Sequence, residues 1–176
     1  MHSSLLKKTL RDEMLKALRT FEHKKEESKI ILDALIESEE FKRAKMILAF
    51  SPMASEPDIS PILDDERVAL PFIENGKMEF SLCKELNKSS MGFLEPAEKI
   101  ALQYDKALII VPLVAFDSSF YRLGRGGGFY DRYIKENRDK LIAIGVAFSI
   151  QRVEKLPIEP FDQKLDHVIC PDNNRK

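Results

Sequence analysis

The residues best suited to chemistry gather in ten consecutive positions, Arg122 to Asp131, which read R-L-G-R-G-G-G-F-Y-D. Glycines let backbone N–H groups approach a ligand without a Cβ in the way, and this run holds Gly124, Gly126, Gly127 and Gly128. Arg122 and Arg125 carry planar, permanently charged groups that fit phosphate or carboxylate. A helix predicted from Phe129 would add free N–H groups, and Asp131 could hold a metal ion. We predict a site for a polyphosphate with its metal ion.

Two common glycine motifs are excluded for this run. No G-x-x-x-x-G-K-[ST] string occurs, which excludes a Walker A loop. The dinucleotide fingerprint G-x-G-x-x-G would need a third glycine at position 129, where the chain has Phe129. A flexible turn before a helix is the simplest alternative interpretation. Two arginines and an aspartate in the same run favour the anion site.

Other charged residues have ordinary interpretations when each is taken alone. Lys7 and Arg11 are four positions apart on one face of a predicted helix, with Lys8 beside them, which is typical of a solvated helix face. Glu56 precedes a predicted helix start, where acidic residues are favourable. Asp162 lies in a P-F-D turn. No Ser/His/Asp or Cys/His arrangement stands out, and the three histidines lack metal-ligand spacing.

The remaining pattern predicts the elements that would position these residues. Apolar residues at helical spacing predict helices over 3–23, 27–43 and 129–138, and Ser60-Pro61 predicts a further helix with Ser60 as N-cap. Short apolar runs predict strands at 46–50, 67–72, 78–83, 107–111, 141–148 and 166–170. This alternation predicts a three-layer α/β/α fold with a mainly parallel central sheet. The glycine run follows the 107–111 strand, at the edge where such sheets bind ligands.

Length and composition narrow the class of protein. The 176 residues predict a single domain over 1–176. A net charge of −1, from 28 basic and 29 acidic side chains, argues against broad binding to nucleic acid or membrane. Cys83 and Cys170 form no C-x-x-C pair, which fits a reducing compartment. No signal-peptide pattern or membrane-length apolar run is visible. We expect a cytoplasmic monomer.

The string R-L-G-R-G-G-G-F-Y-D-R-Y resembles the signature of the 5-formyltetrahydrofolate cyclo-ligase family. The strand and loop before it, V-P-L-V-A-F-D at 111–117, are similar to the family's pattern, and K-K-T-L-R at 7–11 looks like its N-terminal basic helix. Glu56 stands where the family keeps a glutamate after its first strand. V-A-L-P at 68–71, Glu95-Pro96, and L-P-I-E-P-F-D-Q-K-L-D at 156–166 also match in order. The resemblance covers about residues 7 to 171.

The resemblance implies that ATP, with Mg²⁺, drives conversion of 5-formyltetrahydrofolate to 5,10-methenyltetrahydrofolate, with release of ADP and phosphate. The formyl oxygen attacks the γ-phosphorus, N10 then attacks the imidate phosphate, and the ring closes as phosphate leaves. The catalytic residues implied are Arg122 and Arg125. The ATP-binding residues implied are Lys7, Lys8, Arg11, Arg122, Gly124, Arg125, Gly126, Gly127, Gly128, Phe129 and Tyr130. The substrate-binding residues implied are Ser51, Glu56, Arg125, Gly126, Gly127, Gly128 and Phe129. The magnesium ligands implied are Asp131 and Asp162.

The chain departs from the family's pattern at a few positions. Leu113 and Phe120 stand where glycine is common, and Phe129 replaces a tyrosine. Phe161 replaces a polar residue next to Asp162. These departures leave the phosphate-binding core intact and bear on the shape of the folate pocket.

Two other functions stay open at this point. The first is a non-catalytic relative that binds RNA, against which the near-zero net charge and the lack of a basic-aromatic tract argue. The second is another ATP-dependent or sugar-phosphate enzyme on a similar fold, which fold alone cannot separate. The set Glu56, Asp131 and Asp162 favours the cyclo-ligase.

Overall fold

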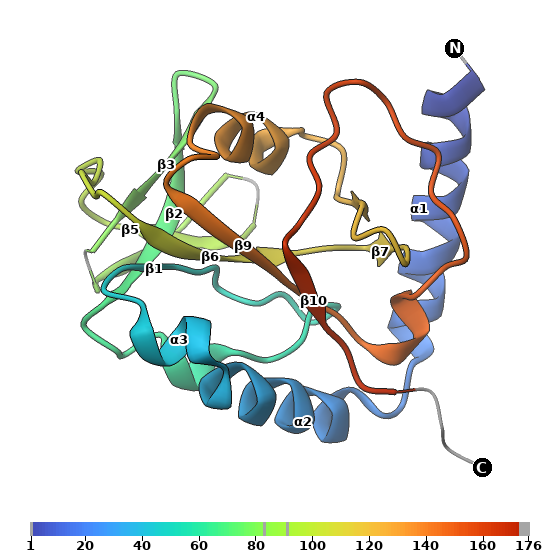
Figure 1. Ribbon diagram of the computed structural model, residues 1–176, viewed down its shortest axis with the longest axis horizontal. Coiled ribbons are helices and arrows are strands. Elements are labelled where there is room, and N and C mark those ends of the chain that lie inside the picture. The colour runs from blue at the N-terminus through green and yellow to red at the C-terminus, as the bar shows by residue number, and fades with distance from the viewer. Residues whose placement is uncertain (1, 83, 91, 173–176) are drawn as a thin grey trace.

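The computed structural model describes residues 2–82, 84–90 and 92–172, and its centre is a six-stranded sheet (Figure 1). The strand order is β10-β9-β6-β1-β2-β3. The strands span Ile47–Leu48 (β1), Val68–Glu74 (β2), Lys77–Ser81 (β3), Ala107–Pro112 (β6), Leu141–Val146 (β9) and His167–Ile169 (β10). Neighbouring strands pair in parallel except β3, which runs antiparallel to β2. The predicted mainly parallel α/β sheet is confirmed.

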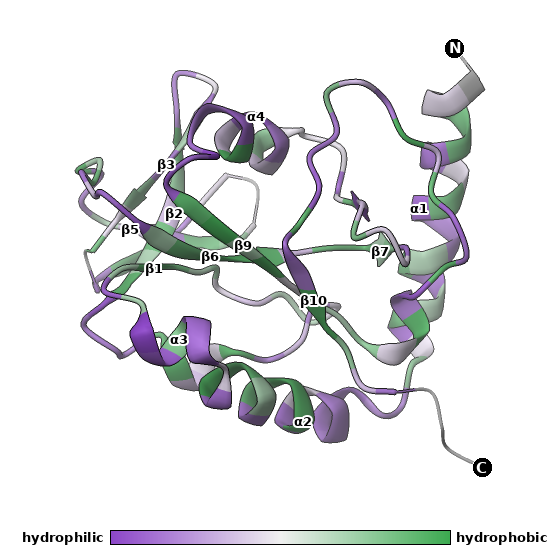
Figure 2. Cartoon of the chain, in the orientation of Figure 1, coloured by the Kyte–Doolittle hydropathy of each residue, from purple (hydrophilic) through white to green (hydrophobic). Residues whose placement is uncertain are grey.

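Helices cover both faces of this sheet. They span His2–Thr20 (α1), Lys24–Glu37 (α2), Glu39–Arg43 (α3) and Phe129–Glu136 (α4). Ile31 and Leu35 of α2 pack into the core on one face, and Tyr133 and Ile134 of α4 pack into the core on the other. In Figure 2, β6 and β9 at the centre are mostly green, whereas the surrounding helices carry both green and purple segments. The three-layer prediction therefore holds, while α1 stands beside the layers (Figure 1).

Smaller elements complete the chain. Two antiparallel ribbons pair Leu86–Lys88 (β4) with Leu94–Pro96 (β5), and Ala115–Phe116 (β7) with Arg122–Leu123 (β8). Single 3₁₀ turns occupy Ser60–Ile62 (η1) and Ser149–Gln151 (η2). No helix in the described part of the chain is both long enough and apolar enough to cross a membrane.

Two helix predictions are wrong in detail. The helix expected over 27–43 is interrupted at Ser38, whose backbone is extended and whose Oγ accepts a hydrogen bond from Phe41 N as the cap of α3. The helix expected from Ser60 is only the turn η1, and its N-cap is Ile59 rather than Ser60, whose N–H and Oγ both donate to Asp58 Oδ1. The Ser60 hydroxyl is engaged by Asp58 and caps no N–H group of the turn. Cys83, in the strand predicted over 78–83, lies outside the described residues.

Buried polar side chains hold the loop that connects β6 to the glycine run. Gln151 is fully buried, and its Nε2 donates to the carbonyl oxygens of Leu113 and Val114 at 2.6 and 3.1 Å. The buried Asp117 carboxylate accepts bonds from backbone N–H groups of 119, 121 and 156. These bonds satisfy the loop's backbone inside the protein, so Arg122 enters the site from a fixed position.

The first two departures from the family pattern have local structural explanations. Phe120 has a φ of 63°, in the left-handed region that favours glycine, so a phenylalanine there carries backbone strain. Its ring lies edge-on to His167, which offsets part of that cost. Leu113 is buried over Gly145, where an added Cβ would lie 2.9 Å from Leu113 Cδ2. The missing side chain at Gly145 therefore makes room for the leucine.

Candidate active site

The residues singled out in the sequence meet around one cavity of about 770 Å³. Four segments carry its polar and charged wall residues: the start of α1, the loop after β1, the glycine run with the start of α4, and the segment 159–162. Residues of the strands and of the β4–β5 ribbon complete the wall. The predicted residues in its wall are Lys7, Lys8, Arg11, Ser51, Glu56, Arg122, Gly124, Arg125, Gly126, Gly127, Gly128, Phe129, Tyr130, Asp131 and Asp162. Residues more than 150 positions apart thus share one wall, as Lys7 and Asp162 do. None of the predicted set lies elsewhere.

The glycine run needs its glycines where the backbone turns into α4. Gly126 and Gly128 have φ values of 105° and 65°, which other residues rarely adopt. Gly128 is the N-cap of α4 and has no side chain that could bind the first N–H groups of the helix. These N–H groups are therefore left for a ligand. Arg11 of α1 donates from Nε to Gly124 O at 2.8 Å. This end of the cavity therefore combines a helix N-terminus with a guanidinium, which suits an anion.

Arg122 is the most deeply buried cation of the site. Its side chain is 3% exposed, and Nη1 donates to Asp131 Oδ1 at 2.7 Å. Its Nε is buried and has no hydrogen-bond acceptor among the described residues. A buried guanidinium needs a fixed carboxylate partner, so Asp131 holds Arg122 in place from the first turn of α4.

Lys7 reaches the cavity from α1 and is held by two carboxylates. Its Nζ donates to Glu159 Oε2 at 2.7 Å and to Asp162 Oδ2 at 2.5 Å. Partial burial by itself lowers the pKa of Lys7, but the hydrogen bonds to Asp162 and Glu159 outweigh it and raise the pKa above its ordinary value. Lys7 is therefore a permanent cation at neutral pH.

Glu56 closes the opposite side of the cavity. Its side chain is 8% exposed, and its Oε2 accepts the Met53 N–H at 2.8 Å. Its Oε1 accepts from Arg125 Nε at 3.2 Å, while Arg125 Nη2 donates to Ser55 Oγ at 2.7 Å. One arginine of the glycine run is thus bound directly to the loop that carries Glu56.

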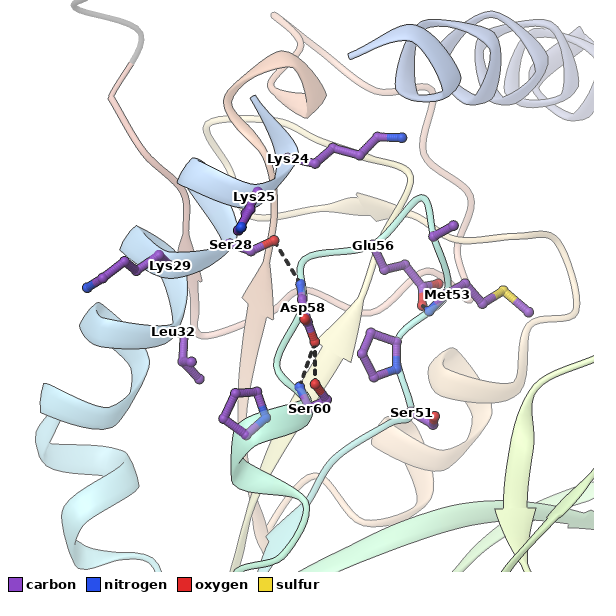
Figure 3. A pocket seen from close by; sticks show the side chains of 13 residues that line it. Lys24, Lys25, Ser28, Lys29, Leu32, Ser51, Met53, Glu56, Asp58 and Ser60 are labelled. Carbon is purple, nitrogen blue, oxygen red and sulfur yellow. Dashed lines mark hydrogen bonds between the residues drawn. The ribbon is translucent and has the colours of Figure 1, made fainter. Parts of the chain in front are cut away.

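The same loop is anchored from behind by α2. The Asp58 N–H donates to Ser28 Oγ at 2.9 Å (Figure 3). A second hollow of about 600 Å³ lies between α2 and this loop, and it shares Ser51, Met53 and Glu56 with the first. Figure 3 shows Lys24, Lys25 and Lys29 on its α2 side. No residue of the glycine run lines this hollow, so the larger cavity is the candidate active site.

Tyr130 adds a neutral donor to the wall. Burial raises the pKa of its hydroxyl, and the negative charge of Glu56 raises it further, against a smaller opposing effect of Arg122. The phenol therefore stays protonated at any physiological pH and can donate a hydrogen bond to an anionic or carbonyl oxygen.

Three cations of the site are paired with carboxylates. Lys7 binds Asp162, Arg122 binds Asp131 and Arg125 binds Glu56. Asp131 and Asp162, the two candidate metal ligands, each accept hydrogen bonds through one carboxylate oxygen, Oδ1 in Asp131 and Oδ2 in Asp162. The second oxygen of each carboxylate accepts no hydrogen bond from the described residues. No group of three or more His, Cys, Asp or Glu residues forms a metal cage in that part of the chain. Two carboxylates with a polyphosphate suit Mg²⁺, which keeps waters and seldom occupies all-protein cages.

The structure adds residues at the site that the sequence did not single out. Glu159 binds Lys7, Ser55 binds Arg125, and Phe93 joins the cavity from the β4–β5 ribbon. Glu159 lies three positions before Asp162 in the I-E-P-F-D stretch, a spacing that could have drawn attention to it. Ser55 and Phe93 carry no local signal, because only the tertiary fold brings them to the glycine run.

Comparisons with known proteins identify the family of this chain. The model of the 5-formyltetrahydrofolate cyclo-ligase family matches residues 3–171. A 5-formyltetrahydrofolate cyclo-ligase of Mycolicibacterium smegmatis is 31% identical over 146 residues, covering 72% of this chain and 74% of that protein. A mitochondrial 5-formyltetrahydrofolate cyclo-ligase of Arabidopsis thaliana is 27% identical over 204 residues, covering 94% of this chain and 74% of that protein.

A solved structure is also similar to this chain. The 5,10-methenyltetrahydrofolate synthetase of Aquifex aeolicus superposes with a TM-score of 0.79 at 30% identity, over 94% of this chain and 89% of the other. The matched residues 3–171 include every residue of the candidate site. The chain belongs to the 5-formyltetrahydrofolate cyclo-ligase family.

Proposed function

We propose that this cavity is the active site in which the chain, an ATP-dependent ligase of folate metabolism, converts 5-formyltetrahydrofolate to 5,10-methenyltetrahydrofolate. The observation that carries the proposal is the position of Arg125. This residue belongs to the phosphate-binding glycine run and is bonded to Ser55 and Glu56 of the facing loop. A guanidinium there lies between a nucleotide on one side and a folate on the other, which is where phosphoryl transfer between them must occur.

The nucleotide lies along the basic wall. Lys7, Lys8 and Arg11 of α1 line the cavity together with the glycine run, and Arg11 is bonded to that run at Gly124. The N–H groups at the start of α4 and the forks of Arg122 and Arg125 bind the phosphates and the charge that develops on them. Because phosphoryl transfer depends mainly on positioning and charge, this wall supplies most of what the reaction requires.

The folate lies against the loop after β1. Glu56 is held by Met53 N–H and is largely buried, so its carboxylate is a fixed acceptor for N–H groups of a pterin. Ser51 and Phe129 line the same cavity. Binding of the pterin requires Arg125 to exchange its bond with Glu56 for the transferred phosphoryl group. The two substrates thereby complete the site together.

The chemical steps follow from this arrangement. The formyl oxygen attacks the γ-phosphorus, the bond from phosphorus to the bridging oxygen of ADP breaks, and ADP leaves. N10 then attacks the carbon of the imidate phosphate and the five-membered ring closes. The C–O bond breaks to release phosphate, and the proton lost from N10 leaves with it. Arg125 neutralises the phosphoryl oxygens in both steps, and the neutral Tyr130 hydroxyl donates a hydrogen bond beside them.

Asp131 and Asp162 hold the Mg²⁺ that accompanies ATP. Each has a carboxylate oxygen without a hydrogen-bond donor in the described part of the site, and both face the same cavity as the glycine run. The ion supplies neutralisation of the phosphate charge. With Asp162 engaged by the ion, Lys7 would keep Glu159 as its partner.

We further propose that the chain works as a monomer in the cytoplasm. The support for the compartment is the pair of distant cysteines, which fits a reducing environment. The relative in Arabidopsis thaliana is mitochondrial, so location of the tagged protein in its own cells is the direct check.

Release of ADP tests the proposed function against other ATP-dependent reactions. With ATP and Mg²⁺ present, addition of 5-formyltetrahydrofolate is expected to start ADP release, one ADP for each folate consumed. A panel of sugar phosphates and a structured RNA, added in its place, is expected to give only the background rate. Release that follows a sugar phosphate and ignores the folate would contradict the proposal.

A further inference from the structure

The two ends of the cavity differ in character. Ser4, Lys7, Lys8 and Arg11 of α1 and Glu159 of the facing segment give one end a polar and charged wall. The other end is apolar and comes from strand ends and the β4–β5 ribbon, through Phe50, Pro71, Ile73, Met78, Phe93, Pro112 and Leu113. The glycine run connects the ends, because Gly124 is bonded to Arg11 and Arg125 is bonded to Glu56.

Phe161 is the exception in the charged end. It lines the cavity, its side chain is 57% exposed, and Lys7 Nζ lies 5.4 Å from its ring centroid. No other aromatic residue among the described wall residues comes from α1 or from the segment 159–162. An aromatic face left open beside a row of cations offers stacking to a flat π-system that carries negative charge nearby.

The direction of the nucleotide follows from the two proposed substrates. Its γ-phosphate must face the folate at Glu56 and the apolar end, so the nucleoside points the opposite way, toward α1 and the segment 159–162. Phe161 is the only described apolar wall residue of those two segments and directly precedes Asp162, a proposed ligand of the metal ion on the phosphates. The base therefore reaches Phe161 while the phosphates stay on the glycine run.

We propose that Phe161 is the platform on which the purine base of the nucleotide stacks. This inference rests on the proposed function and adds to it the subsite for the base. Stacking is tolerant of base identity, since every base has a π-face. Phe161 thus replaces the polar residue of the family pattern by an aromatic surface that binds the nucleoside. The same ring is in contact with the Lys7 ammonium group.

The chain contains no tryptophan, so Phe161→Trp places a single fluorescent reporter at the platform. Addition of ATP with Mg²⁺ is expected to quench this fluorescence, whereas inorganic tripolyphosphate, which has the phosphates and no base, is expected to leave it unchanged. In calorimetric titrations, Phe161→Ala is expected to weaken ATP binding about tenfold. Its affinity for tripolyphosphate is expected to stay within about twofold of that of the unsubstituted protein.

Ile158→Ala is the matched control, because Ile158 is an exposed apolar residue of the same segment, 49% exposed, that does not line the cavity. It is expected to bind ATP and tripolyphosphate as the unsubstituted protein does. Equal loss of ATP and tripolyphosphate affinity in Phe161→Ala would overturn the proposal, since Phe161 would then act only by placing Lys7. Unchanged ATP affinity would overturn it as well. Failure of the unsubstituted protein to bind ATP would instead contradict the proposed function.

Discussion

Arg125→Ala is expected to lower kcat/KM by at least about a hundredfold while the fold stays intact. Arg125 belongs to the glycine run and is bonded to Ser55 and Glu56, so it is the cation placed between the two substrates. The transferred phosphoryl group gains charge on oxygens that only a fixed donor in a water-poor cavity stabilises well. Steady-state rates with both substrates varied measure the effect, and circular dichroism through thermal unfolding checks the fold.

Stability is expected to change little because the Arg125 side chain is 44% exposed and its ion pair with Glu56 is partly solvated. Arg125→Lys keeps the charge but loses the planar guanidinium that reaches Ser55 and Glu56 together. Its kcat/KM is therefore expected to lie between that of the unsubstituted protein and that of Arg125→Ala. Arg43→Ala, an exposed arginine on α3 far from the cavity wall, serves as the control and is expected to retain full activity. Near-unchanged kcat/KM in Arg125→Ala would rule out the assigned role.

Asp162→Asn is expected to raise the Mg²⁺ concentration needed for half-maximal activity by about tenfold or more. The amide keeps an oxygen that can accept the Glu159 N–H, so the loop retains its local bond. It loses the negative charge that a hard cation prefers. Titration of activity with Mg²⁺ at fixed ATP measures the shift.

Asp166→Asn is the control for this series. Asp166 accepts bonds from Ala143 N and Arg138 in the same C-terminal stretch but does not line the cavity, so the Mg²⁺ requirement is expected to stay unchanged. Asp131→Asn is a less clean test, because it also leaves the buried Arg122 without its carboxylate, which costs about 3–5 kcal/mol of stability. An unchanged Mg²⁺ requirement in Asp162→Asn would remove Asp162 from the metal site.

Much of the site could be predicted from the sequence because its parts are local. The glycine run contains its own arginines and aspartate, and the following helix starts where the glycines end. The strand before it, 107–112, is a continuous apolar run, which is typical of a strand buried on both faces. Local signals of this kind placed the run at the carboxyl edge of the sheet.

The rest depends on contacts between distant segments. Lys7, taken alone, is indistinguishable from a solvated surface lysine, and only the fold brings it against Glu159 and Asp162. Ser38 and Ser60 show a second limit. The helix predicted from Ser60 is only the single turn η1. Ser38 bonds to Leu35 O and accepts the Phe41 N–H, which ends α2 and starts α3 where the apolar pattern would continue one helix. Such competition is decided by local hydrogen bonds, which periodicity does not register.

The near-UV absorbance of the methenyl product tests the proposed reaction most directly. Purified protein is mixed with 5-formyltetrahydrofolate, ATP and Mg²⁺, beside samples that lack ATP or the metal ion. We expect absorbance to rise only in the complete mixture and to be largely lost with Arg125→Ala. A folded protein that binds ATP and gives no rise in the complete mixture would contradict the assignment of this cavity to folate cyclisation.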